Sequence, residues 1–229
     1  MKELSNKDNL QVLYEDNHII AVNKRVGDIV QGDKTGDKPL SDVVKEYIKD
    51  KYSKPGEVFL GVVHRLDRPT TGIVLFARTS KALTRLNELF KNRETQKTYW
   101  TIVKNKPEKP EANLVHYLKR NEKNNTSKAF PKEVPDSKHA SLDYKIIKEL
   151  QNYTALEINL HTGRHHQIRA QLSAIGSPIK GDLKYGADRS NPDGGIHLHA
   201  RQLVLVHPVT KEKLTLTAPV PADPLWIAI

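Results

Sequence analysis

The sequence predicts an α+β fold with a central, mostly antiparallel mixed sheet, and three observations support this class. Short apolar runs of strand length, rich in β-branched residues, recur between residues 12 and 216. A few amphipathic helical stripes stand between these runs, without the regular strand–helix alternation of a parallel sheet. The 229 residues are also enough to bury a core. We therefore expect one sheet with flanking helices.

The first third of the chain is predicted to begin with a hairpin. Residues 12–14 and 19–22 are β-rich runs on either side of a polar four-residue turn. A short amphipathic helix should follow, with Ser41 as its N-cap. Residues 58–63 and 73–77 are continuous apolar runs, which are typical of buried strands.

The middle of the chain alternates between regular and polar segments. Ser80 should open a helix with leucines on its inner face, and residues 97–103 return to strand. Residues 104–139 are polar, lysine-rich and interrupted by prolines, and only residues 114–118 have a strand pattern. We predict that residues 104–139 form a long basic surface excursion.

The last third of the chain should return to the sheet. A helix is expected over residues 165–175, ended by Gly176, and one further helical turn is expected in the last residues of the chain. Four further strands are expected, at residues 142–147, 156–160, 196–206 and 214–216.

The composition points to a polyanionic partner. Lys and Arg number 37 against 27 Asp and Glu, so the formal net charge is +10. Clustered cations bind phosphates through counterion release, which favours a nucleic acid. Solubility through net charge is the alternative, and composition alone leaves it open.

The chain contains no cysteine, which excludes disulfides, cysteine–zinc sites, iron–sulfur clusters and a thiol nucleophile. The N-terminus has no apolar core of signal-peptide length, and no apolar run reaches the length of a membrane span. We therefore predict a cytoplasmic protein with no membrane partner.

Charged side chains gather between the apolar runs at 58–63 and 73–77. His64, Arg65, Asp67 and Arg68 are four ionisable residues within five positions. An ordinary turn is one interpretation, because Asp-x-Pro with a nearby glycine is common in turns. Spacing alone does not make Asp67 catalytic.

The string from His64 to Ala77, His-Arg-Leu-Asp-x-x-Thr-Thr-Gly-x-x-Leu-x-Ala, resembles the signature of RluA-type pseudouridine synthases. Further segments resemble motifs of that family in the same order: residues 14–24, Lys97-x-Tyr99, residues 162–169, residues 181–186, and residues 198–208. Two departures from the family pattern are Arg25, where a proline is usual, and Ala170-Gln171, where many members have a histidine.

This resemblance implies a domain organisation. Residues 12–229 would form a single pseudouridine synthase catalytic domain with an RNA-binding cleft, preceded by a tail over residues 1–11. The small N-terminal RNA-binding domain of some family members is not expected. RNA choice would then depend on the catalytic domain itself.

The resemblance also implies a reaction: isomerisation of specific uridines in ribosomal or transfer RNA, without a cofactor or metal. Asp67 matches the family's essential aspartate, which acts as a nucleophile or base. Arg169 matches the arginine that pairs with this aspartate and keeps it ionised. Tyr99 matches the tyrosine that packs on the target base and helps to remove a proton from its carbon 5.

RNA contacts are implied for five residues. Arg65 would fill the gap left by the flipped uridine, with a structural ion pair as the alternative. Lys24 and Arg164 would contact phosphate, although a solvated surface charge fits each nearly as well. His64 and Lys97 complete the set. Whether residues 119–138 form an RNA-contacting flap or a mobile loop stays open.

Two histidine pairs have metal-ligand spacing, but neither has a third ligand nearby. We interpret His161, His165, His197 and His199 as structural and predict no metal. The rival functions are a catalytically idle RNA-binding protein and a hydrolase of small anionic substrates. A steep salt dependence of RNA binding would exclude the hydrolase. We predict a monomer.

Overall fold

Residues 3–33 and 35–229 are described by the computed structural model, and the chain divides into two units. The first unit contains residues 1–96 and 200–220, and the second contains residues 97–199 and 221–229. Within the described ranges, no helix is long and apolar enough to span a membrane. The predicted α+β class is confirmed, while a single domain over residues 12–229 stays a prediction.

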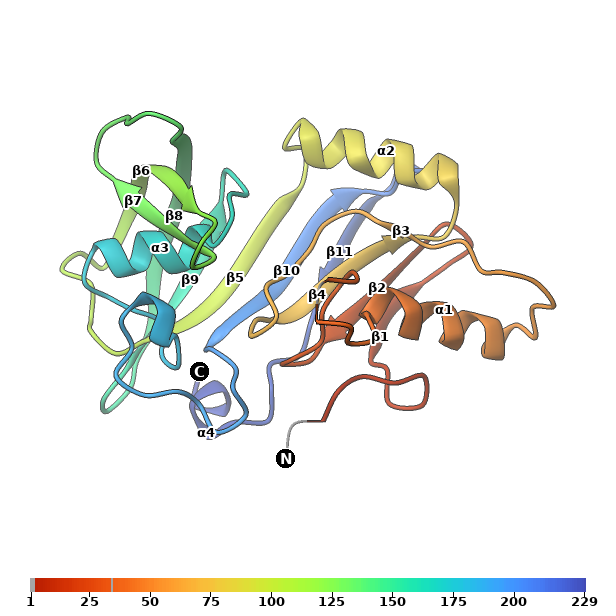
Figure 1. The fold of residues 1–229 in the computed structure, drawn as a ribbon, viewed down its shortest axis with the longest axis horizontal. Helices are drawn as coiled ribbons and strands as arrows, with labels where there is room; N and C mark the ends of the chain where they lie inside the picture. The colour runs from red at the N-terminus through yellow and green to blue at the C-terminus, as the bar shows by residue number, and fades with distance from the viewer. Residues whose placement is uncertain (1–2, 34) are drawn as a thin grey trace. The chain divides into compact units, whose positions relative to one another are not determined.

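The first unit is built on antiparallel strands (Figure 1). The hairpin of β1 (Val12–Glu15) and β2 (Ile19–Lys24) is confirmed, and β2 also pairs with β4 (Thr71–Ala77). Farther along the chain, β10 (Leu198–Val206) pairs with β11 (Lys213–Thr217). All residues of β2 and β4 are buried, which explains why both strands have continuous apolar runs.

The apolar run at residues 58–63 is only partly a strand. β3 is limited to Gly61–Val62, which pair with Ala77 and Phe76 of β4. Phe59 is 48% exposed, so the run is not buried over its whole length. The prediction of a full buried strand here is wrong. The whole run is apolar, but only Gly61 and Val62 pair with a neighbouring strand.

Two helices belong to the first unit, α1 (Leu40–Lys51) and α2 (Ser80–Lys91). The start of α2 is confirmed, and the Thr79 side chain caps it by accepting from the Ala82 amide at 3.2 Å. The predicted Ser41 cap of α1 is wrong. Pro39 is the N-cap residue, and the Leu40 and Ser41 amides donate to the carbonyls of Ile29 and Val30, which makes a side-chain cap unnecessary.

The segment before β1 is held against the first unit. Ser5 donates from its amide (2.9 Å) and its hydroxyl (2.6 Å) to the Asp28 carboxylate. Arg25, where the family usually has proline, forms an ion pair with Glu3 at 2.5 Å. The described part of the predicted tail is therefore packed, and Met1 and Lys2 lie outside the described residues.

In the second unit, five antiparallel strands follow the order β5-β9-β8-β6-β7. Their bounds are Gln96–Val103 for β5, Glu111–Asn121 for β6, Thr126–Phe130 for β7, Lys138–Glu149 for β8 and Thr154–Leu160 for β9. The unit also contains α3 (Gln167–Ala174), a 3-10 turn (Leu183–Tyr185) and α4 (Pro224–Ile227).

Much of the predicted excursion at residues 104–139 is a β-hairpin. β6 and β7 pair from Tyr117↔Phe130 to Asn121↔Thr126, and β6 also pairs with β8. Leu114 and Leu118 are the buried positions of β6, and most of the strand's other side chains are polar. A half-buried strand usually buries every second side chain, whereas β6 buries one in four. Its alternation of apolar and polar residues is therefore weak, and the sequence resembles a loop.

The helix α3 covers one face of this hairpin (Figure 1). Leu118, Ala140, Ala170 and Tyr185 form a small core cluster there. Gly176 has φ +76°, the left-handed conformation that a helix-ending glycine adopts. The predicted helix and its glycine stop are confirmed.

Candidate active site

Asp67 lies on a short turn between β3 and β4. The Thr70 amide donates to the Asp67 carbonyl at 2.9 Å and closes the turn. Leu66 and Thr70 on either side are buried, Asp67 itself is half-buried, and Arg65 is exposed. An anchored backbone thus presents the Asp67 carboxylate with the Arg65 guanidinium two residues before it.

Lys24 helps to anchor this turn through hydrogen bonds to its backbone. Lys24 is 1% exposed, and its ammonium donates to the carbonyls of Arg25 (3.0 Å), Arg68 (3.1 Å) and Thr70 (2.7 Å). The contact of Lys24 with RNA phosphate stays a prediction, and in the first unit its ammonium binds three backbone carbonyls. This burial could not be predicted from the sequence, since a lysine at the end of a strand is usually solvated.

Gly72 follows the turn and is required by the local geometry. Its φ is +111°, and a Cβ built there would lie 2.4 Å from the Ala200 carbonyl oxygen. Both the positive φ and the close approach of β10 exclude a side chain. The signature's glycine is thus explained by backbone packing.

His64 is engaged by the fold of the first unit. Its Nε2 accepts from the Leu75 amide at 3.0 Å, and its ring stacks on Phe90 with centroids 5.0 Å apart. The Nε2 must therefore be unprotonated, with any ring proton on Nδ1. These contacts give His64 a structural role that its predicted RNA contact did not include.

Tyr99 and Lys97 lie on β5. Tyr99 is 9% exposed and pairs with Ile158 of β9. Lys97 lies two residues earlier, so both side chains project from the same face of the strand. The Lys97 ammonium reaches Gly163, at 3.7 Å from the position that a Cβ would take there. Lys97 is thereby brought to the start of the motif that contains Arg164 and Arg169.

That motif begins with a turn fixed by side chains. Gln167 Oε1 accepts from the Thr162 hydroxyl (2.8 Å) and the Arg164 amide (3.0 Å), and its Nε2 donates to the Ser141 carbonyl (3.1 Å). The Arg164 Nε donates to the His139 carbonyl at 3.0 Å. Arg164 is therefore tied to β8 and half-buried, rather than a freely solvated charge.

Arg169 is buried on α3 with a carboxylate of its own. Its Nε and Nη2 donate to the two oxygens of Asp182 at 2.6 and 2.8 Å, and both side chains are almost fully buried. The Tyr185 ring lies beneath the guanidinium, 4.9 Å from its Cζ. This bidentate pair and the ring contact fix the orientation of the cation.

Tyr185 links Arg169 to the β6–β7 hairpin. Its hydroxyl accepts from the Ser127 amide at 2.7 Å and lies 2.9 Å from His166 Nδ1. Ser127 also bonds His165, through the Nδ1 at 2.9 Å and the carbonyl at 2.8 Å. A hydrogen-bonded relay therefore joins the hairpin, the two histidines and the aromatic support of Arg169.

Two of these partners were missed as site residues by the sequence. Asp182 and Tyr185 lie in the Gly-Asp-x-x-Tyr-Gly segment that resembles a family motif. The motif could have indicated that these two residues belong to the site. Its spacing does not indicate that they contact Arg169.

A family model described as RNA pseudouridylate synthase matches residues 18–174. The chain belongs to this family. It is 33% identical over 237 residues to an uncharacterized RNA pseudouridine synthase of Chlorobaculum parvum, covering 93% of this chain and 72% of the relative. This pseudouridine synthase is accordingly an isomerase that acts on uridine in RNA.

Two relatives from Vibrio cholerae have names that specify an RNA. This synthase is 30% identical to tRNA pseudouridine synthase C, over 95% of this chain and 93% of the relative. It is 32% identical to ribosomal large subunit pseudouridine synthase D, over 93% of this chain and 68% of the relative. The similar identities do not favour either RNA class.

Solved structures agree with the fold. Human RNA pseudouridylate synthase domain containing 4 has a TM-score of 0.77 at 24% identity, over 95% of this chain and 90% of that one. Human RNA pseudouridylate synthase domain containing 1 has a TM-score of 0.76 at 22% identity, over 99% of this chain and 89% of that one. At these identities the likeness concerns the fold alone.

The four histidines of metal-ligand spacing have other partners in the pseudouridine synthase. His161 pairs with Asp143 at 2.6 Å, and His165 bonds Ser127. His197 is buried between Asn191 (2.9 Å) and Asp223 (3.2 Å), and burial lowers its pKa. His199 packs near Trp226. In residues 3–33 and 35–229, three or more His, Asp or Glu side chains nowhere gather as a metal site would require.

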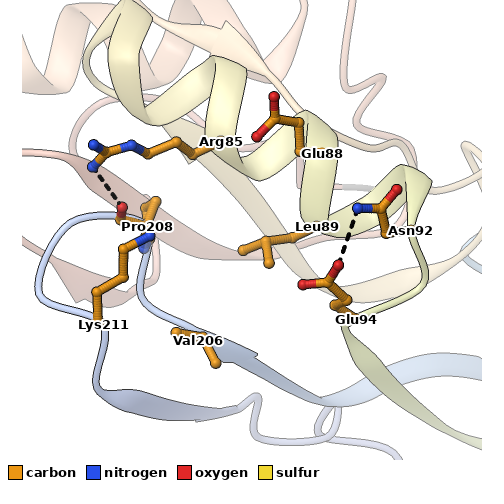
Figure 2. Close-up of a pocket in the computed structure, with 8 residues that line it drawn as sticks. All are labelled: Arg85, Glu88, Leu89, Asn92, Glu94, Val206, Pro208 and Lys211. Atoms are coloured by element: carbon orange, nitrogen blue, oxygen red, sulfur yellow. Dashed lines mark hydrogen bonds between the residues drawn. The ribbon is translucent and has the colours of Figure 1, made fainter.

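A cavity of about 210 Å³ lies elsewhere in the first unit of the synthase, between α2 and the end of β10 (Figure 2). Arg85 on its wall donates to the Pro208 carbonyl at 2.8 Å. Its other lining residues are Glu88, Leu89, Asn92, Glu94, Val206 and Lys211. Two cations are balanced by two carboxylates, so the cavity shows no preference for phosphate.

Proposed function

We propose that this pseudouridine synthase isomerises specific uridines in ribosomal or transfer RNA, with Asp67 as the essential aspartate. The observation that supports Asp67 is its position in the family signature, on a turn closed by Thr70 and held by the buried Lys24 ammonium. A catalytic group must be held by rigid surroundings, and this turn meets that requirement.

The reaction conserves every atom of the nucleotide. The bond from N1 of uracil to ribose breaks, the base turns, and a bond from carbon 5 to the same ribose carbon forms. Carbon 5 then loses a proton and N1 gains one. We propose that the Asp67 carboxylate starts this sequence as a nucleophile or as a base towards ribose.

Arg169 and Tyr99 are proposed as the partners of Asp67 in this chemistry. The bidentate bond to Asp182 and the Tyr185 ring give Arg169 one orientation, which suits a cation that stabilises charge. Tyr99 is nearly buried on β5, so its ring has the rigidity needed to pack on a base.

RNA contacts are proposed for Arg65, Lys97 and Arg164. Arg65 is exposed on the Asp67 turn, where a planar cation could fill the place of an extruded uridine. Lys97 and Arg164 are both half-buried beside Gly163 and β8, and each has hydrogen-bond donors suited to phosphate. We also propose that the enzyme is a cytoplasmic monomer, which the absence of cysteine supports for the compartment.

The test is pseudouridine mapping on total RNA from cells with and without the gene, complemented with wild type or Asp67→Ala. We expect particular pseudouridines to disappear on deletion and to return with wild type only. Asp50→Ala, an exposed carboxylate on α1, is the matched control and should restore them. If Asp67→Ala restores them as well, the catalytic assignment is wrong.

The same experiment separates the alternative function. If no pseudouridine changes on deletion, and the purified wild-type protein still binds RNA with a steep salt dependence, the chain is an RNA-binding protein without catalysis.

A further inference from the structure

Three rings lie in one row across neighbouring strands of the second unit. Tyr117 of β6 pairs with Phe130 of β7 on one side and with His139 of β8 on the other. The Tyr117 and His139 rings meet edge to face, with centroids 5.8 Å apart. We call Phe130, Tyr117 and His139 the aromatic row.

The aromatic row lies on the face of the sheet opposite α3. Leu118 and Ala140 are the sequence neighbours of Tyr117 and His139, and both are buried in the cluster that packs against α3. Successive strand residues point to opposite faces, so the row points outward. His139 is exposed, Tyr117 and Phe130 are partly exposed, and Val115 beside the row is 47% exposed.

Cations surround the aromatic row. Lys119 and Lys128 are paired one step along β6 and β7, and the Lys128 ammonium lies 5.2 Å from the centroid of the Phe130 ring. Arg164 reaches the other end, where its Nε donates to the His139 carbonyl. Lys119 lies 3.4 Å from Asp136, whose side chain is 87% exposed, so solvent weakens that pair.

We propose that the aromatic row is a stacking surface for unpaired bases of the RNA substrate, with Lys119, Lys128 and Arg164 contacting the adjacent phosphates. The proposal rests on the proposed function, because it assumes an RNA substrate. It assigns to the β6–β7 hairpin a role in holding RNA outside the residues that carry the chemistry.

The chemistry of this face favours RNA over a protein partner. Single-stranded RNA is bound by aromatic rings that stack on bases and by cations that follow the backbone. The core of a protein–protein interface is instead depleted of lysine. A row of rings with lysines beside it on an exposed sheet face has the composition of a surface that binds single-stranded RNA.

The test measures the affinity of the full chain for a short fluorescein-labelled oligouridylate by fluorescence anisotropy. We expect Tyr117→Ala and Phe130→Ala each to raise Kd at least about fivefold, because alanine substitution removes one base–ring stack. Lys128→Ala should lower the slope of log Kd against log salt by about 0.7, the contribution of one phosphate contact on a single strand.

Matched variants separate stacking from folding. Phe59→Ala removes an exposed ring of the first unit and should leave Kd unchanged. Tyr117→Phe keeps the ring and should bind as wild type, whereas Tyr117→Leu keeps an apolar side chain and should bind as Tyr117→Ala. If Tyr117→Leu binds as wild type, or if Tyr117→Ala leaves Kd unchanged, the stacking surface is wrong.

Turnover distinguishes this proposal from the proposed function. Asp67→Ala should bind the oligouridylate normally and form no pseudouridine. If row variants bind and react as wild type while Asp67→Ala is inactive, the stacking surface fails and the proposed function stands. If sedimentation shows that wild type self-associates and that Tyr117→Ala/Phe130→Ala does not, the face is an interface between copies and the RNA proposal is overturned.

Discussion

The Asp67 turn of the first unit and the Arg169 segment of the second unit hold their charged groups by different means. The Asp67 turn is supported through its backbone, since the buried Lys24 ammonium donates to the carbonyls of Arg25, Arg68 and Thr70. Arg169 is supported through its side chain, by the Asp182 carboxylate and the Tyr185 ring.

This difference teaches how each group tolerates substitution. The three carbonyl bonds of Lys24 do not involve the Asp67 side chain, so they remain when Asp67 is replaced. The Arg169 guanidinium depends on other side chains, and removal of the Asp182 carboxylate takes away the bonds to both its Nε and its Nη2. The second unit should therefore show the larger stability effects.

The largest expected effect comes from Asp182→Asn. Removing one member of a buried ion pair costs about 3–5 kcal/mol, because the guanidinium loses the charged acceptor of two of its hydrogen bonds. Urea unfolding should show this loss, and pseudouridine formation should fall with it. Asp188→Asn removes an exposed partner of Lys104 and should leave the free energy of unfolding nearly unchanged, because solvent screens that pair. Equal costs for both variants would contradict the comparison.

Lys24→Met should have the next largest effect. The substitution leaves the Arg68 and Thr70 carbonyls without their donor, at about 1–3 kcal/mol for a buried polar group. The loosened turn should also lower kcat more than it raises KM. Lys45→Met, an exposed lysine on α1, serves as the control in the same unfolding and turnover assays. A Lys24→Met enzyme with wild-type stability would show that the turn does not need the ammonium.

Tyr185→Phe tests the relay with a smaller change. The ring beneath Arg169 is kept, but the Ser127 amide loses its acceptor and His166 loses a partner, so we expect a cost of about 1–2 kcal/mol. Tyr144→Phe removes one bond, to the Lys109 carbonyl, and is the matched control. The relay is contradicted if turnover and its pH profile are the same in Tyr185→Phe and Tyr144→Phe.

The smallest effect is a pH dependence from the second unit. Burial lowers the pKa of His197, and Asp223 opposes this only in part; burial also lowers the pKa of His116. Between the lowered folded pKa and the unfolded value of 6.5, the unfolded chain binds more protons, so the free energy of unfolding falls as the pH falls below about 6.5. The stabilisation is fully present above this pH.

Urea unfolding at about pH 7.5 and about pH 5.5 measures this difference, which follows the titration range of histidine. His197→Gln should reduce it, because glutamine does not titrate. If the change in the free energy of unfolding between the two pH values is the same in His197→Gln and wild type, the pH dependence comes from other groups.

Much of the fold could be predicted from local patterns. The β1–β2 hairpin, the strand β4 and the helix α2 carry continuous apolar runs or a clear helical stripe, and each was placed within a few residues. The β6–β7 hairpin could not be predicted, because its buried positions are few and its exposed positions are lysine-rich. Its pairing depends on β8 and α3, which are distant in sequence.

The candidate site shows the same division. The family signature predicts Asp67 as a site residue, and two further motifs predict Tyr99 and Arg169, because these residue types occur at fixed places in the motifs. The burial of Lys24 and the engagement of His64 were not predictable, since each depends on carbonyls or rings supplied by other segments.

By itself the sequence determined the family, the reaction class and the α+β composition. Only the tertiary structure decided which carboxylate holds Arg169, which lysine is structural, and that Phe130, Tyr117 and His139 share one face. The physical reason is that composition and periodicity are local properties of the chain. Burial and pairing are set by residues far apart in sequence, and they become visible when the strands and helices are packed.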